Sequence, residues 1–149
     1  MKIIPRIIQS RLRSRPAISS STSACAGPQP TKAGACPPRV LGALFEQFVG
    51  LELLRATREV SASLKLEFWR DPDGPEVDWI VVGDDRWVPV EVKWSDAPAE
   101  RDTRHLQTFL SEYPKAREGV VVCRTPRRFK IAPKITAIPW QEIHSLVEV

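Results

Sequence analysis

Three runs rich in β-branched and aromatic residues, joined by short polar connections, constrain the fold of this chain most. They span residues 64–70, 76–82 and 86–94. The connection 71–75, of sequence DPDGP, has turn chemistry, and the GDD segment at 83–85 is typical of a hairpin loop. Because connections this short favour antiparallel pairing, the sequence predicts a three-stranded antiparallel meander.

Helical periodicity flanks the meander on both sides. A first helix is expected at about residues 40–59, directly after two prolines that can open a helix. A second helix follows the meander and ends after Tyr113, because Pro114 cannot continue it. The apolar stripes consist of Leu41, Leu44, Phe45, Phe48 and Leu51 in the first helix and of Leu106, Phe109 and Leu110 in the second.

Further short elements complete the expected domain. The run 120–124 begins with consecutive apolar residues, which suits a strand covered on both faces. Residues 129–132 are a strand candidate, and IPWQEIHSLV at 138–147 suits a short helix. We therefore expect an α/β domain in which helices flank a mixed sheet made of the meander and a further strand.

The charge divides the chain at residue 39. Of the 22 basic and 18 acidic residues, residues 1–39 hold seven basic and no acidic ones, which gives this part a charge of +7. Residues 40–149 then carry −3, so the sequence pI of about 9.2 reflects the first part alone. The alkaline pI is therefore no sign that the folded part binds nucleic acid.

Residues 1–39 are expected to form a disordered leader, because they are rich in proline and serine and poor in apolar residues. An organellar targeting peptide is the alternative, since such peptides are rich in arginine and serine and poor in acids. No stretch is long and apolar enough to span a membrane. We expect a cytoplasmic protein with one folded domain at 40–149.

Cysteine and histidine are too few for two common kinds of small domain. The 3 cysteines form no CxxC pair, and the chain has 2 histidines. Neither a disulfide scaffold nor a zinc site of cysteine and histidine is expected. We expect Cys123 to fill the core, His105 to lie on the surface, and the tryptophans to pack rather than to stack on bases.

The alternation of side chains along the strands predicts where polar groups gather. In the third run the valines mark the core face, so Glu91 and Lys93 share the opposite face, about 7 Å apart along the strand. Pairing through 83–85 would bring Asp78 of the second run beside Glu91. In that run the two faces are expected to hold Val77, Trp79 and Val81 on one side and Glu76, Asp78 and Ile80 on the other.

Two carboxylates and one ammonium on a sheet face have a chemical meaning. Carboxylates are hard oxygen ligands for Mg²⁺ or Mn²⁺, and water with a phosphodiester oxygen can complete the coordination. A lysine beside the cation can orient or help to deprotonate the attacking water. The alternative is a solvated strand pair with a cross-strand salt bridge.

Glu46 lies in the first helix away from the main apolar stripe. It belongs to a second strip, with Gly42, Val49 and Leu53, that is otherwise small or apolar. A carboxylate near a buried surface needs a partner. Periodicity leaves open whether that partner is an arginine such as Arg70, or a metal or a lysine of the site.

Taken in order, FEQFV, FWRDPDGPEVDWIVV and VPVEVKW resemble the PD-(D/E)XK nuclease-like superfamily. More narrowly, they are similar to the domain of unknown function at the C-terminal end of many prokaryotic AAA+ type P-loop ATPases. The resemblance covers about residues 40–145. The spaced acids and lysine carry the wider match, and the tryptophan-rich context of FWRD, VKWS and IPW strengthens the narrower one.

The resemblance implies roles for particular residues. Asp78 and Glu91 would be metal ligands, with the carbonyl of Val92 as a further ligand, and Lys93 would position the water. Glu46 would be the acidic residue of the first helix. Gln107 is a weak candidate for a residue that some members place in the following helix, and Arg70 and Arg104 could contact phosphate.

Two departures from the family bear on the expected partners. Val77 stands where the proline of the superfamily's name would be, which leaves the aspartate intact. The chain has no GxxxxGK[ST] motif, so ATP binding is not expected and the chain looks like a shortened member. Its expected partners are therefore DNA, or a separate ATPase or other protein.

A basic stretch near the C-terminus is a weaker nucleic-acid candidate. It lies between Glu118 and Glu142, contains no acid, and comprises Arg124, Arg127, Arg128, Lys130 and Lys134. A solvated edge is the alternative interpretation.

Two functions and a third outcome remain open from the sequence. The first function is a metal-dependent phosphodiesterase that acts on DNA through Glu46, Asp78, Glu91 and Lys93, with Mg²⁺ or Mn²⁺ as cofactor. The second is a non-catalytic module with a nuclease-like framework that binds DNA or a protein. The third outcome is a shortened chain without an independent function.

Overall fold

The computed structural model describes residues 37–71 and 74–148. The expected leader at 1–39 therefore lies outside the described residues apart from its last three positions. In chain order the elements are α1 (Pro38–Val60), β1 (Lys65–Arg70), β2 (Glu76–Val82), β3 (Trp87–Val92), the 3₁₀ helix η2 (Glu100–Thr103), α2 (Arg104–Glu112), β4 (Gly119–Cys123), β5 (Phe129–Ala132), β6 (Ile135–Pro139) and the 3₁₀ helix η3 (Trp140–Leu146).

One mixed sheet forms the centre of the domain, with the strand order β1-β2-β3-β4-β6-β5. The β1/β2 and β2/β3 pairs are antiparallel, which confirms the predicted meander. Strands β3, β4 and β6 then run parallel, and β5 pairs antiparallel with β6 at the edge. The expected mixed sheet flanked by helices is therefore the observed architecture.

Strand β6 was not predicted from the sequence. Residues 138–147 were expected to be helical, but Ile138 and Pro139 end β6, and the helical turns of η3 start only at Trp140. Strand β6 lies between β4 and β5, and most of its residues are buried. A tight turn at Lys134, whose φ of 63° lies in the left-handed region, brings β6 back against β5.

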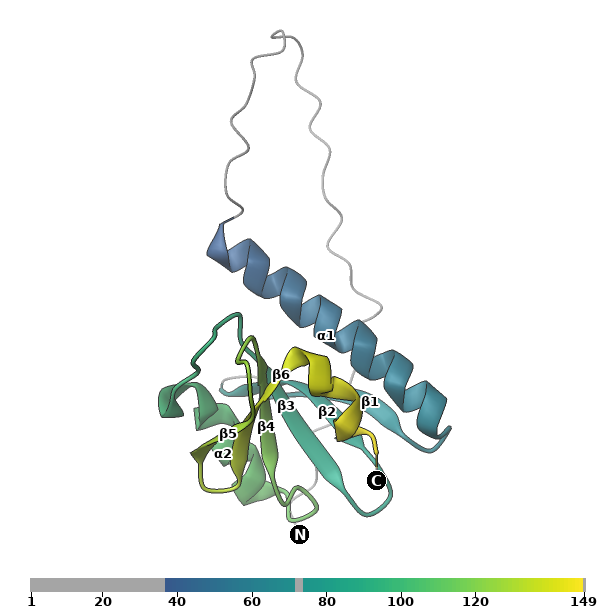
Figure 1. Cartoon of the computed structure of the whole chain (residues 1–149). Coiled ribbons are helices and arrows are strands. Elements are labelled where there is room, and N and C mark those ends of the chain that lie inside the picture. Colours follow the sequence, from purple (N-terminus) through teal and green to yellow (C-terminus); the bar gives the residue numbers. More distant parts are fainter. Residues whose placement is uncertain (1–36, 72–73, 149) are drawn as a thin grey trace, which may run out of the picture.

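The helices cover the two faces of the sheet separately (Figure 1). Helix α1 and η3 lie on one face, and α2 lies on the other. The core under α1 is built around Val49, Leu53, Val81, Val90 and Val122. The core under α2 is built around Leu106, Phe109, Val77, Ile80 and Val121. Sheet residues that point to opposite faces thus belong to two separate clusters, as alternation along a strand requires.

Helix α1 packs on the sheet with its second strip rather than with its main apolar stripe. Of the predicted stripe only Phe45 is buried, whereas Leu44, Phe48 and Leu51 are 55%, 40% and 48% exposed. The buried positions lie along the second strip, around Val49 and Leu53. Both strips are apolar, so periodicity alone could not decide which one packs on the sheet.

Close packing at Gly50 fixes where α1 lies on the sheet. A Cβ atom at this position would come within 2.4 Å of the Trp79 side chain. Only glycine therefore lets the helix approach the middle of β2 this closely. Neither α1 nor any other helix within residues 37–71 and 74–148 combines the length and the apolar character that a membrane span requires.

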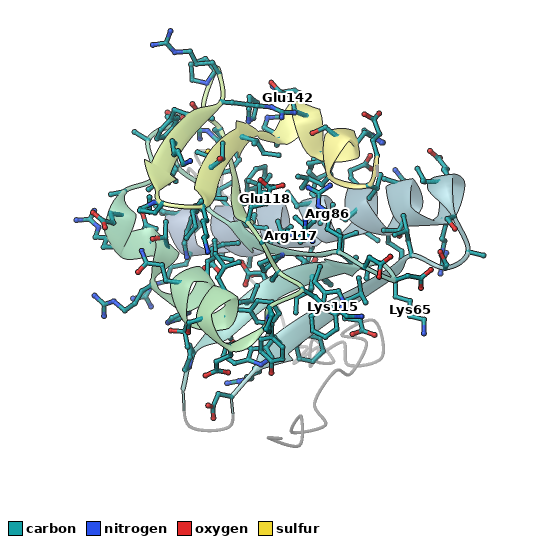
Figure 2. All side chains as sticks on the ribbon, turned by 90° about the horizontal axis from the view of Figure 1, so that it is seen from below. Lys65, Arg86, Lys115, Arg117, Glu118 and Glu142 are labelled. Atoms are coloured by element: carbon teal, nitrogen blue, oxygen red, sulfur yellow. The ribbon has the colours of Figure 1, made fainter. Side chains whose placement is uncertain are left out.

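Polar contacts close the end of the sheet at which β3 and β4 begin. Figure 2 shows Arg86, Lys115, Arg117 and Glu118 gathered there. Arg86 pairs with Glu118 at 2.6 Å, and the Lys115 ammonium donates to the carbonyl of Asp84 at 2.8 Å. These contacts tie the β2–β3 loop to the segment that leads into β4.

Candidate functional site

The candidate site lies at the opposite end, where the ladder between β2 and β3 stops. The last regular pair there is Trp79 with Val90. One step further, the backbone N–H of Val92 donates to Oδ2 of Asp78 at 2.9 Å. A backbone N–H of a strand points along the sheet toward its neighbour. The Asp78 carboxylate therefore takes the place that a backbone carbonyl of β2 would have held.

A β-bulge in β2 explains this position. Glu67 of β1 pairs with Ile80, but Trp69 pairs with Val77, so Asp78 and Trp79 together oppose a single residue of β1. The bulge also interrupts the alternation of faces. Val77 consequently packs under α2 with Ile80, and not on the same face as Trp79 and Val81 as predicted.

Glu91 and Lys93 lie together, as the alternation predicted. The Lys93 ammonium pairs with Oε1 of Glu91 at 2.8 Å, with side-chain exposures of 37% for the lysine and 8% for the glutamate. The other oxygen of Glu91, Oε2, is buried and has no hydrogen-bond partner in the part of the chain that the structure describes. Such an atom costs folding free energy unless something else binds to it.

Burial raises the pKa of both carboxyls of the site. Burial, together with the charges of Glu91 and Glu46, raises the pKa of Asp78 to about 7. The hydrogen bond from the N–H of Val92 and the charge of Lys93 act in the opposite direction and offset part of this rise. Burial also raises the pKa of Glu91, although the ammonium of Lys93 and the charge of His105 oppose this. Both carboxyls are therefore harder to ionise than in water.

Lys93 keeps its charge in this environment. Burial lowers the pKa of its ammonium, but the charge and hydrogen bond of Glu91 and the charges of Asp78 and Asp102 outweigh that effect. The net result is a raised pKa. An ammonium held in this way can orient and stabilise negative groups but is a poor base.

Glu46 faces the same cluster from α1. Its side chain is half-buried, and its charge contributes to the raised pKa of Asp78. Arg70, one of the partners expected for Glu46, forms an ion pair with Glu76 at 3.7 Å. The structure thus brings Glu46, Asp78, Glu91 and Lys93 into electrostatic contact around the end of the β2–β3 ladder.

The remaining predicted residues do not join this cluster. Gln107 is exposed and donates to Thr103 of the preceding turn at 3.0 Å, and Arg104 is exposed at the start of α2. Arg127 and Lys130 are also exposed. Arg128, a further nucleic-acid candidate, forms an ion pair with Glu142 and donates to the hydroxyl of Ser145.

His105 was expected to be a surface residue, and this was wrong. It is half-buried, and its Nδ1 lies 3.0 Å from the backbone carbonyl of Glu76. Its charge acts on Glu91. The signal in the sequence was its place directly before Leu106 on the apolar side of α2, a position that a fully solvated residue seldom holds.

The donor atoms of the site fit a divalent cation only in part. Asp78 and Glu91 offer carboxylate oxygens, and the bare Oε2 of Glu91 suits a positive ligand. However, no group of three or more His, Cys, Asp or Glu side chains within residues 37–71 and 74–148 could hold a metal ion. The donors fit a hydrated Mg²⁺, which protein sites often hold with one or two carboxylates, but not a cage built of side chains.

Fold and site together define an α/β domain with an acid–lysine cluster at the end of two antiparallel strands. The chain belongs to the family described as domain of unknown function DUF4143, whose sequence model matches residues 41–143. This family match confirms the expected relationship to a family of domains of unknown function. The wider PD-(D/E)XK assignment stays a prediction.

Other comparisons add little. Among curated proteins no match to this chain is found. Among solved structures, the fold resembles a chain in the refined half-complex from a tetradecameric assembly of Thermococcus gammatolerans McrB AAA+ hexamers with bound McrC. The TM-score is 0.45 at 16% identity, and the match covers 66% of this chain and 27% of that chain. The chain thus spans about a quarter of the length of that protein, and a likeness this weak indicates nothing about function.

Proposed function

We propose that this chain is a metal-dependent nuclease-like domain that acts on DNA phosphodiesters. The observation that carries the proposal is Oε2 of Glu91, a buried carboxylate oxygen without a hydrogen-bond partner in the described residues. It lies in a cluster where burial makes both Asp78 and Glu91 harder to ionise, and where the charge of Glu91 adds to this effect on Asp78. A divalent cation would bind to the bare oxygen and stabilise both carboxylates in their charged form.

The roles of the residues follow from their contacts. Asp78 and Glu91, with the carbonyl of Val92, would hold Mg²⁺ or Mn²⁺. The cation would polarise a phosphodiester oxygen and lower the pKa of a bound water. Because Lys93 stays protonated, it would orient the water and offset the charge of the phosphate rather than accept a proton. Glu46 would add negative charge that favours cation binding.

The alternative is a non-catalytic module that binds DNA or a protein. Two observations favour it: Asp78 already accepts the N–H of Val92, and Lys93 is already paired with Glu91. Such a polar network could stabilise the end of the ladder without any metal. The resemblance to ATPase-associated domains would make a separate ATPase one candidate protein partner.

Calorimetric titration with Mn²⁺ tests the metal site directly. We expect the full chain to bind Mn²⁺, and Asp78→Asn and Glu91→Gln each to weaken binding at least about tenfold, since each removes a charged ligand. Glu118→Gln is the matched control, because it removes an acid at the other end of the sheet. Equal binding by all four proteins, or no binding by any, would exclude the proposed cation site.

Cleavage of linear DNA with Mg²⁺ then separates the two functions. Replacing Lys93 with alanine should reduce cleavage by about 100-fold or more while far-UV circular dichroism stays unchanged. Metal binding without DNA cleavage by the parent protein would favour the non-catalytic module.

A further inference from the structure

A hollow lined by aromatic side chains lies near the C-terminal ends of the parallel strands. Its volume is about 470 Å³, and its lining consists of Phe45, Phe48, Trp94, Asp96, Arg124 and Trp140. Three of these residues follow the ends of the parallel strands: Trp94 after β3, Arg124 after β4 and Trp140 after β6. Helix α1 supplies the two phenylalanines. The hollow thus lies at the C-terminal edge of the parallel strands, on the side that α1 covers.

The aromatic rings are held in two pairs. Phe45 and Trp94 meet edge to face with centroids 5.2 Å apart, and Phe48 and Trp140 do so at 5.5 Å. Trp94 is nevertheless 38% exposed and Phe48 is 40% exposed. Large aromatic side chains left in water next to one another are typical of a surface that binds a partner.

Arg124 and Asp96 give the hollow polar groups with defined directions. The Arg124 guanidinium lies over Trp94, 4.2 Å from the ring centroid, and two of its nitrogens donate to the carboxylate of Asp96 at 2.8 and 3.0 Å. The guanidinium thus already holds the cation–π position on Trp94, and Asp96 offsets its charge. The Asp96 side chain is 64% exposed, so its carboxylate can accept further hydrogen bonds from a ligand.

A basic segment begins at the hollow with Arg124. The segment from Arg124 to Lys134 contains no acid, and its Arg127 and Lys130 are exposed. The hollow also adjoins the candidate site in sequence, since Phe45 precedes Glu46 and Trp94 follows Lys93. A ligand that combines a planar aromatic group with a repeating negative charge would match the aromatic rings, Asp96 and the basic segment at once.

We propose that the hollow is a subsite for single-stranded DNA, in which one base stacks beside Trp94 and Arg124 while the basic segment contacts the backbone. Asp96 accepts a hydrogen bond from an exocyclic amino group, so cytosine is bound better than thymine. This proposal takes DNA as the class of substrate from the proposed function, on which it rests. It adds that the bound DNA is single-stranded and that cytosine is preferred.

Binding measured without metal keeps this proposal separate from catalysis. Fluorescence anisotropy of a labelled 15-nucleotide oligo(dC), in EDTA and at low salt, requires neither a cation site nor cleavage. The full chain should bind, and Trp94→Leu should weaken binding by about 5- to 150-fold, the usual range for the loss of one stacked base. Trp94→Phe keeps a smaller ring, so its affinity should lie between those of the full chain and of Trp94→Leu. Leu44→Ser is the matched control, because it removes an exposed apolar side chain from α1 outside the hollow.

The base preference gives a second readout. The parent chain should prefer oligo(dC) to oligo(dT) by about three- to tenfold, and Asp96→Ala should remove most of that ratio. Absence of oligonucleotide binding by the parent chain would overturn the subsite, as would equal binding by Trp94→Leu with an unchanged melting temperature. Either result leaves the metal titration and the cleavage assay to decide the proposed function. Conversely, a Lys93→Ala protein that binds oligo(dC) normally but cleaves nothing would support both.

Discussion

The two ends of the sheet carry ion pairs of nearly equal length in opposite surroundings. Where β3 and β4 begin, Arg86 and Glu118 pair at 2.6 Å with exposures of 36% and 55% (Figure 2). Where β3 finishes, Lys93 and Glu91 pair at 2.8 Å, but Glu91 is only 8% exposed. Distance alone would rank the two pairs as equivalent, and burial separates them.

The difference in burial decides what each end can do. Water screens the Arg86–Glu118 pair, so it joins two loops at little gain or cost in free energy. At the other end, burial raises the pKa of Asp78 and Glu91 and leaves an oxygen of Glu91 without a hydrogen bond. Groups kept in such an unfavourable state are more common at functional sites than elsewhere. One end of the sheet thus holds a solvated ion pair, and the other holds the buried acids to which we assign the proposed cation site.

The largest effect is expected where α1 packs against Trp79 in the middle of β2. Gly50→Ala would bring a Cβ atom to 2.4 Å from the ring of Trp79, so the helix or the ring must move. We expect the free energy of unfolding to fall by about 1–3 kcal/mol. Urea denaturation of the full chain measures the loss.

Gly42→Ala is the matched control in the same helix. No atom lies within 4 Å of a Cβ at this position, so the better helix propensity of alanine should stabilise the protein by about 0.5–1 kcal/mol. A destabilising Gly42→Ala, or a neutral Gly50→Ala, would show that α1 does not pack on Trp79 in this way.

The next effect is the pH dependence of stability. A pKa of Asp78 of about 7 lies above the ordinary aspartate value of 3.8, so between these values the folded chain binds a proton that the unfolded chain has released. The unfolded state therefore binds fewer protons, and stability should fall as the pH rises from about 4 to about 7. Glu91, whose pKa is also raised, contributes in the same direction.

Replacement of Asp78 isolates its share of this slope. Asp78→Asn can still accept the N–H of Val92 but does not titrate, so the loss of stability from pH 4 to 7 should shrink by roughly 1–3 kcal/mol. Denaturation midpoints across that pH range measure it, with Glu118→Gln as the control that should leave the slope unchanged. A slope of unchanged size in Asp78→Asn would mean that Asp78 is ionised throughout this pH range.

The regular elements followed from local patterns in the sequence. Strand β2 has the predicted bounds, and β1, β3 and β4 are displaced by at most two residues at either end. Turn residues and apolar runs carry this information locally, because they depend on neighbours along the chain. The sheet position of β6 could not be predicted in the same way, since its run ITAIP is continuous with the segment that forms η3.

The candidate site was predictable only in part. The nearness of Asp78, Glu91 and Lys93 followed from strand alternation and a short loop. The bulge at Asp78 and Trp79 could not be predicted from the sequence, because it depends on the register of β2 against β1. The hollow was missed because Trp94, Arg124 and Trp140 come from three separate strand ends, and only the parallel order of β3, β4 and β6 brings them together.

The smallest expected effect comes from breaking the two ion pairs singly. Lys93→Ala leaves the buried Glu91 without its ammonium and should cost about 1–2 kcal/mol at pH 8, less than for a fully buried pair because the lysine is partly exposed. Arg86→Ala should cost less than about 0.5 kcal/mol, since its partner is solvated. At pH 5 the cost of Lys93→Ala should be smaller, because burial raises the pKa of Glu91 and so favours its protonation as the pH falls, whereas that of Arg86→Ala should hardly change. Equal costs at both ends, measured by chemical denaturation at the two pH values, would show that water reaches Glu91 as freely as Glu118, and the contrast between the two ends would then disappear.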